Sequence, residues 1–134
     1  PIVISDAAHS IGSLIDDIPT PLFSDFIVFS FHSVKNITTV VGGAIIFKIF
    51  NEVQDHLILI ELCLFSLNGQ SKTAFEKNSI GGWKYDIITN GLKVNMPDIN
   101  AAIGLAQIKK YKHILLTERE QIFLKYISIL DQYS

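Results

Sequence analysis

Three short apolar segments in the first half of the chain most constrain its fold: residues 1–5, 26–31 and 42–49. Each has the length of a β-strand, is rich in β-branched or aromatic residues, and is bordered by turn-forming residues. The first segment ends at Asp6, and we expect it to be a buried strand that delivers a carboxylate at its carboxyl end. Ligands bind at that edge in open α/β sheets. Asp6 is therefore a candidate site residue.

The second half of the chain carries helix signals. Residues 51–67 are long enough for a helix, and residues 68–91 follow as a loop-rich stretch with several turn signals. Residues 96–111 have a proline near the start, an acid in the first turn and lysines at the end, which is the pattern of a helix. The apolar face expected for this helix consists of Ile99, Ala102, Ile103 and Ala106.

A capping box predicts where the last helix begins. Thr117 and Glu120 form a T-x-x-E sequence ahead of an apolar stripe, so we expect a separate helix to start there. Strands in the first half and helices in the second half favour an α/β layer fold.

Composition excludes several classes of function. The net charge is −2 without a basic run, which argues against nucleic-acid binding or a charge-driven membrane role. The longest apolar run, residues 56–67, is interrupted by Glu61 and is too short to span a bilayer. Cys63 is the only cysteine, which excludes an intrachain disulfide; we expect a buried side chain and a cytoplasmic protein. No His, Cys or Asp spacing suggests a metal site.

A carboxylate at one strand end and a lysine after another strand form the pair that pyridoxal phosphate chemistry requires. Asp6 would hold the ring nitrogen protonated, and Lys35 would form the Schiff base with the cofactor. Lys35 has a plainer interpretation as a solvated loop lysine. Hydroxyl groups that are candidates for a phosphate pocket, or for caps of their own backbone, come from Ser30, Ser33, Thr38 and Thr39.

An ordered set of motifs gives the chain a family resemblance. "DAAHS", "FSFHSVKNITTVVGG", "SLNGQSK" and "GGWKYDIITNGLKVNMPDINAAIGLAQIKKY" occur in this order, followed by "ER". Together they resemble the sugar aminotransferases of the DegT/DnrJ/EryC1/StrS family over nearly the whole chain. The resemblance implies the large domain of a fold-type I aminotransferase, a three-layer α/β/α structure with a mixed, mostly parallel sheet. Residues 1–134 would form part of this cofactor-binding domain, without its N-terminal part and the C-terminal small domain.

The resemblance also assigns roles around pyridoxal 5'-phosphate. Lys35 matches the lysine that binds the cofactor covalently, and Asp6 matches the partner of the pyridine nitrogen. His9 matches the Gln or His near the phenolic oxygen, although a buried histidine without this role is the alternative. Ser30 matches a hydroxyl that helps to hold the phosphate. Val41 departs from the family, since relatives often carry Glu before the glycine pair.

Family members are homodimers with shared active sites, which implies a second copy as partner. The segment 91–98 matches the stretch that reaches the neighbour's phosphate, and the contacting residue would be Lys93 or Asn95. His32, Trp83 and Tyr85 are candidates for the substrate pocket, with packing as the alternative for each.

The expected reaction is transamination of a nucleotide-linked keto sugar for surface polysaccharide or a related glycan, with glutamate as the expected donor. One alternative is a sugar dehydratase, whose members carry histidine in place of the lysine; Lys35 argues against it. The other is a truncated remnant without activity. We also expect residues 1–134 alone neither to bind the cofactor tightly nor to turn over, because a phosphate needs several convergent donors.

Overall fold

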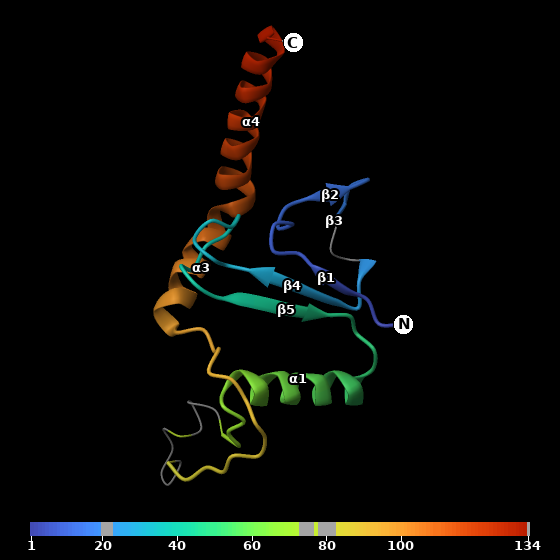
Figure 1. Ribbon diagram of the computed structural model, residues 1–134, viewed down its shortest axis with the longest axis vertical. Helices are drawn as coiled ribbons and strands as arrows, with labels where there is room; N and C mark the ends of the chain where they lie inside the picture. The colour runs from blue at the N-terminus through green and yellow to red at the C-terminus, as the bar shows by residue number, and fades with distance from the viewer. Residues whose placement is uncertain (20–22, 73–76, 78–82, 134) are drawn as a thin grey trace. The chain divides into compact units, whose positions relative to one another are not determined.

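The computed structural model describes residues 1–19, 23–72, 77 and 83–133 (Figure 1). The chain divides into two compact units, which are described separately. The first unit joins Pro1–Phe47 to Met96–Ser134, and the second is Lys48–Asn95.

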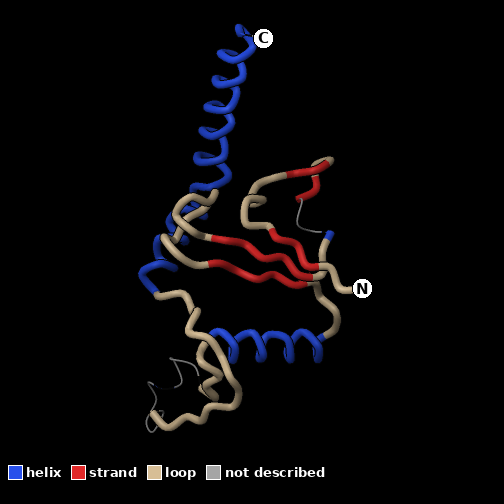
Figure 2. Tube along the Cα trace, in the orientation of Figure 1, coloured by secondary structure: helices blue, strands red, loops and turns tan. Residues whose placement is uncertain are grey.

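The three apolar segments form one sheet in the first unit, with the order β1-β4-β5 (Figure 2). Strand β1 is Ile4–Asp6, β4 is Phe26–Ser30 and β5 is Gly43–Phe47. β1 runs parallel to β4, whereas β5 runs antiparallel to β4. The sheet is therefore mixed, and the expected α/β class with three strands is confirmed.

The expected burial of the first strand is wrong for the described residues. Ile4 is 68% exposed, whereas Ile27 in the central strand β4 is 5% exposed. β1 has a single neighbour in the sheet, so its side chains receive less cover than those of β4. Buried residues that form the small core of this unit are Ala7, Ile27, Ile37, Thr39 and Tyr111.

A small hairpin follows β1. β2, Leu14–Ile15, pairs antiparallel with β3, Ile18–Pro19. Asp16 and Asp17 between them have φ of 50° and 63°. Two-residue hairpin turns of type I′ require positive φ at both positions, and Asp tolerates this conformation. The two aspartates are therefore turn residues.

The last two helices form one continuous element. α3, Asp98–Lys110, passes through a π-helical turn, Tyr111–Leu115, into α4, Leu116–Leu130. The predicted helix at 96–111 is confirmed, but the capping box at Thr117 is wrong. Leu115 before α4 has helical backbone angles, so the chain presents no free helix start that Thr117 could cap.

The second unit begins with the expected helix. α1 is Glu52–Ser66, and the Asn51 side chain caps it by accepting a hydrogen bond from the backbone N–H of Gln54 at 3.0 Å. Residues 86–94 then pair with residues 65–71 through backbone hydrogen bonds and the bridges Leu67–Lys93 and Gln70–Ile87. Across the described residues of both units, every helix falls short of the length and apolarity required to cross a membrane.

Candidate active site

The carboxyl ends of β1 and β4 carry two predicted site residues. Asp6 ends β1, and its carboxylate accepts a hydrogen bond from the backbone N–H of Ala8 at 3.1 Å. Ser30 ends β4, and its hydroxyl oxygen accepts from the N–H of His32 at 3.3 Å. Because the two strands are parallel neighbours, both residues lie at the same edge of the sheet. This is the edge that the sequence pattern indicated.

A short contact near this edge joins Lys35 to His9. Lys35 Nζ lies 2.6 Å from His9 Nε2, across 26 residues of sequence. Lys35 is half-buried and follows a turn in which its N–H donates to the carbonyl of His32 at 2.9 Å. His32 itself is exposed on that turn. The amine of Lys35 is therefore held against an imidazole, which separates it from an ordinary solvated lysine.

Lys35 lies in a closed loop, residues 31–42, which we call the lysine loop. Its ends meet through a hydrogen bond from Phe31 N–H to the Gly42 carbonyl at 2.8 Å, and Thr39 N–H donates to the Phe31 carbonyl at 2.9 Å. Val40 has a φ of 71°, which is unusual for a β-branched residue. The loop is thus held in a defined conformation, including one strained position.

The threonine hydroxyl groups of the lysine loop serve the loop itself. Thr39 is 2% exposed and donates to the Val41 carbonyl at 2.8 Å. Thr38 accepts from the N–H of Val40 at 3.0 Å. Of the two interpretations of these hydroxyl groups, capping of nearby backbone is the one that the structure supports.

Side-chain amides outside the sequence prediction fix the lysine loop to its surroundings. Asn36 donates to the carbonyl groups of His9 and Ile11, at 3.3 and 3.0 Å. Gln107 of α3 accepts from Thr38 N–H at 3.1 Å and donates to the Thr38 carbonyl at 2.6 Å. Asn100 of α3 donates to the Thr39 carbonyl. The spacing of seven between Asn100 and Gln107, two helical turns, is the only sequence signal that favoured these residues.

The face of α3 that contacts the lysine loop is not the expected apolar face. Ile99 is 78% exposed and Ile103 is 37% exposed. Gly104, which is buried, lies against Thr39 instead. Loop carbonyl and N–H groups need hydrogen-bond partners, which polar side chains supply and apolar ones do not. The apolar pattern therefore identified the helix, and polar residues outside that pattern form the contact with the loop.

Tyr111 connects the end of α3 to the turn that carries His9. Its hydroxyl group donates to the Ile11 carbonyl at 2.6 Å. Burial raises the pKa of the Tyr111 phenol, while the positive charge of Arg119 and a hydrogen bond with Asn36 act in the opposite direction. The phenol thus stays protonated in neutral solution and can donate this bond.

Four other predicted residues lie in the second unit. Lys93 is exposed and its amine donates to the Asn95 side-chain oxygen at 2.6 Å. Trp83 is 71% exposed and Tyr85 is 44% exposed. The amine of Lys77 lies 3.7 Å from the centre of the Tyr85 ring, a cation–π contact. Lys93 and Asn95 therefore contact each other, and the aromatic residues remain open to solvent.

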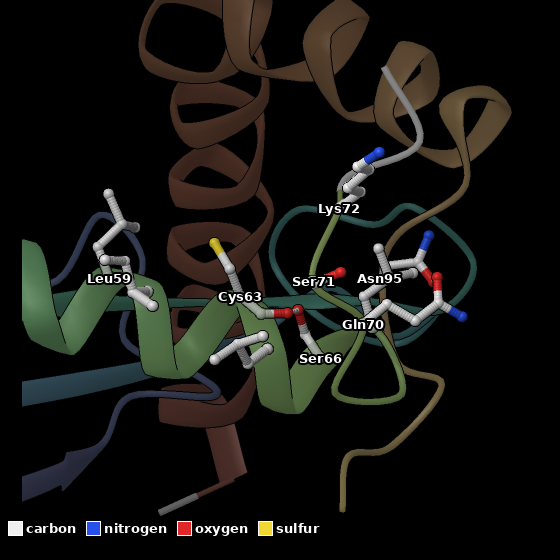
Figure 3. A pocket seen from close by; sticks show the side chains of 10 residues that line it. Leu59, Cys63, Ser66, Gln70, Ser71, Lys72 and Asn95 are labelled. Carbon is white, nitrogen blue, oxygen red and sulfur yellow. Dashed lines mark hydrogen bonds between the residues drawn. The ribbon is translucent and has the colours of Figure 1, made fainter. Parts of the chain in front are cut away.

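The second unit also contains a cavity of about 390 Å³ beside the carboxyl end of α1. Figure 3 shows Cys63 and Leu59 on the helix side, and Gln70, Lys72 and Asn95 on the side of the following segments. Cys63 is exposed there, so its expected burial is wrong. Within the described ranges, no cluster of three or more His, Cys, Asp or Glu side chains could hold a metal ion.

The donor set at the sheet edge fits pyridoxal phosphate. A primary amine is required for the carbonyl of the cofactor, a carboxylate for its ring nitrogen and hydroxyl groups for its phosphate. Asp6 and Ser30 supply the carboxylate and the hydroxyl group from adjacent strand ends, and Lys35 supplies the amine from the lysine loop after β4. Ser30 accepts a hydrogen bond within the chain, but a hydroxyl group retains its own proton to donate.

Comparison with known proteins agrees with the family resemblance of the sequence motifs. The family model of the DegT/DnrJ/EryC1/StrS aminotransferases matches residues 2–134. The spore coat polysaccharide biosynthesis protein SpsC of Bacillus subtilis is 31% identical over 131 residues, which are 97% of this chain and 32% of SpsC.

Solved structures agree in fold. Spr1654 of Streptococcus pneumoniae, which is named as a sugar aminotransferase, matches in its PMP form with a TM-score of 0.80 and 42% identity. This match covers 95% of the chain and 32% of Spr1654. PseC of Helicobacter pylori, an aminotransferase of pseudoaminic acid biosynthesis, gives a TM-score of 0.72 at 30% identity, covering 94% of the chain and 30% of PseC. The chain thus spans about a third of the length of these relatives.

Proposed function

Because the chain belongs to the DegT/DnrJ/EryC1/StrS aminotransferase family, we propose that it carries the cofactor-binding lysine of a pyridoxal-phosphate-dependent sugar aminotransferase. One observation carries this proposal: the amine of Lys35 lies 2.6 Å from His9, at the sheet edge where β1 ends in Asp6. Solved relatives in PMP and PLP forms support the choice of cofactor.

Each residue at this edge has a distinct task in the proposed reaction. When bound, the cofactor supplies a carbonyl group for the amino nitrogen and a ring that stabilises negative charge at the carbon that loses its proton. The Asp6 carboxylate holds a proton at the ring nitrogen. Lys35 Nζ moves a proton between two carbon atoms as general acid and base. Ser30 donates a hydrogen bond to the phosphate.

His9 orients the amine of Lys35. An imidazole nitrogen 2.6 Å from Nζ accepts a hydrogen bond from the amine or ammonium group, and it donates when its own proton is on that nitrogen and the amine is neutral. In either state the Nζ direction is fixed, which favours proton transfer at one defined place.

The substrate and the amino donor are the finer part of the proposal. SpsC is named for spore coat polysaccharide biosynthesis and PseC for pseudoaminic acid, which supports a sugar as amino acceptor. We propose a nucleotide-linked keto sugar as acceptor and glutamate as donor. His32, Trp83 and Tyr85 remain candidates for sugar contacts, since all three side chains are exposed. The proposed location is the cytoplasm, where the thiol of the single cysteine, Cys63, stays reduced.

A second copy of the chain is the proposed partner. Family resemblance assigns the segment 91–98 to the neighbour's cofactor site, and Lys93 and Asn95 in this segment are exposed and in contact with each other. A lysine amine and an asparagine amide can both donate to a phosphate. We propose that this pair completes the site of the partner subunit.

The direct test is covalent mapping of the cofactor in the whole protein. Borohydride reduction after incubation with pyridoxal phosphate should fix the cofactor to Lys35, as peptide mass spectrometry would detect. Lys35→Ala should lose the visible absorption of the bound cofactor and lower amino transfer by at least about 10³-fold, because the amine is needed for the proton transfers. Lys109→Ala is the matched control, since Lys109 is exposed on α3.

Three outcomes separate the alternatives. Labelling at another lysine, or turnover retained in Lys35→Ala, would reject the assignment of Lys35. A product that has lost water without gaining nitrogen would indicate the sugar dehydratase. Protein that folds as the purified whole chain but neither binds the cofactor nor transfers an amino group would indicate the remnant.

A further inference from the structure

The backbone segments that carry Lys35 and His9 both form hydrogen bonds with one face of the same helix. α3 and the first residue after it present Asn100, Gly104, Gln107 and Tyr111 at intervals of four, three and four residues. Such spacing places side chains on one face of a helix. We call this face the anchor stripe.

The first half of this arrangement holds the lysine loop. Gln107 forms two hydrogen bonds with one residue, since its amide oxygen accepts from Thr38 N–H and its NH₂ group donates to the Thr38 carbonyl. These two bonds have the same donor and acceptor pattern as a hydrogen-bonded residue pair in an antiparallel β-sheet. Thr38 follows Lys35 by three residues, and Thr39 beside it packs against Gly104 with only 2% exposure. Displacement of Gln107 would therefore remove two of the hydrogen bonds that hold the loop of Lys35.

The second half of the anchor stripe holds the turn that carries His9, residues 7–13, which we call the histidine turn. Tyr111 lies one helical turn after Gln107 and donates to the Ile11 carbonyl at 2.6 Å. Asn36, the neighbour of Lys35, donates to the same carbonyl at 3.0 Å and to the His9 carbonyl at 3.3 Å. The phenol and the amide thus meet at Ile11, between the turn of His9 and the loop of Lys35.

We propose that Gln107 and Tyr111 are positioning residues that set the distance between Lys35 Nζ and His9 Nε2. A lysine side chain has four rotatable bonds, so its amine stays beside the imidazole only if both backbones are fixed. Neither Gln107 nor Tyr111 touches the amine, so both act through the lysine loop and the histidine turn. The functional part of the inference rests on the proposed role of Lys35 as the cofactor lysine.

The test measures the reactivity of Lys35 in the whole protein without cofactor. Sulfo-NHS acetate acylates neutral lysine amines, and peptide mass spectrometry gives the rate at Lys35 alone. We expect His9→Phe to change this rate by about threefold or more, because the variant removes the hydrogen bond at Nζ. In a protein that already carries Gln107→Met or Tyr111→Phe, the His9→Phe substitution should change the acylation rate of Lys35 by less than half as much.

Two controls separate positioning from stability. Lys109→Met changes an exposed residue of the same helix and should leave the effect of His9→Phe intact. Asn51→Ala removes the cap of α1 and lowers stability without a change in the anchor stripe. It should also leave the effect intact. Thermal unfolding of each variant shows whether the folded state is populated during labelling.

The result that overturns the proposal is an effect of His9→Phe on Lys35 acylation that persists undiminished in folded Gln107→Met and Tyr111→Phe. If Gln107→Met does not fold, Tyr111→Phe decides, because it keeps the ring and loses one hydroxyl group. No effect of His9→Phe in the unchanged protein would also reject the proposal, since there would be no contact to position. Failure of Lys35 as the cofactor lysine would appear in the borohydride mapping and would leave these rates unchanged.

Discussion

At the scale of single residues, polar atoms decide where the reactive groups lie. The carboxylate of Asp6, the amide of Asn36 and the phenol of Tyr111 each bond to backbone groups of the turn that carries His9. A net hydrogen bond contributes only about 0.5–1.5 kcal/mol to stability, but each fixes a direction in space. Position, more than stability, is what these residues contribute to the candidate site.

Tyr111 leads to a prediction on pH. Burial raises its pKa above the usual 10.0, against the charge of Arg119 and the hydrogen bond with Asn36. The folded state therefore keeps the phenolic proton where the unfolded state has lost it, and this stabilisation, complete below pH 10, is lost as the pH rises through the raised pKa. We expect the free energy of unfolding in urea to fall above pH 10, and to fall less steeply in Tyr111→Phe.

The control for this prediction is Tyr133→Phe, because Tyr133 is 85% exposed. Its variant should keep the alkaline slope of the unchanged protein. Equal slopes in the two variants would show that Tyr111 does not contribute to the loss of stability.

At the scale of elements, α3 acts as a support for the lysine loop through a close contact. A Cβ atom added at Gly104 would lie 2.8 Å from Thr39 Cγ2, and Thr39 is 2% exposed. Glycine inside a helix costs about 1 kcal/mol relative to alanine. Glycine at position 104 therefore lowers the stability of the helix but allows the loop to approach the backbone of α3.

Gly104→Ala tests which of the two effects is larger. We expect the variant to be less stable by about 1–3 kcal/mol, because the buried Thr39 cannot move away without disturbing the loop. Thr39→Ser removes Cγ2 and keeps the hydroxyl group that donates to Val41. The double variant Gly104→Ala with Thr39→Ser should recover stability relative to Gly104→Ala, as urea unfolding would measure. A Gly104→Ala protein at least as stable as the unchanged one would contradict this account.

At the scale of the whole molecule, the described chain exposes many apolar side chains. Large apolar residues of α4 that are more than half exposed are Ile122, Phe123, Leu124, Tyr126 and Leu130. Exposed apolar patches of large size indicate contact with further protein. The chain also spans only about a third of its relatives, so the complete site and the proposed dimer belong to the whole protein.

A mixed dimer tests the proposed sharing of sites. A Lys35→Ala subunit combined with a subunit changed at Lys93 and Asn95 should recover transamination, since one of the two sites is then built from intact parts. Neither variant alone should show more than a small part of the unchanged activity. The measurement is amino transfer by purified heterodimers carrying two different affinity tags. Heterodimers without recovered activity would contradict a shared site.

The sequence by itself determined the order and type of the main elements. Strands at 26–31 and 42–49 and helices at 51–67 and 96–111 follow from β-branched runs, proline position and length, which act locally. Motif order also determined the family, which the match over residues 2–134 confirms. Asp6 and Lys35 were selected because strand ends collect site residues, although their catalytic roles stay predictions.

Only the tertiary structure decided which side chains meet. The contact of Lys35 with His9 spans 26 residues, and that of Gln107 with Thr38 spans 69. A local pattern contains no information on such distant pairs, because the partners are polar and have no periodicity in common. The failed capping box at Thr117 has the same cause: the π-helical turn that buries Tyr111 carries α3 into α4 without a break, so packing outweighed the local signal.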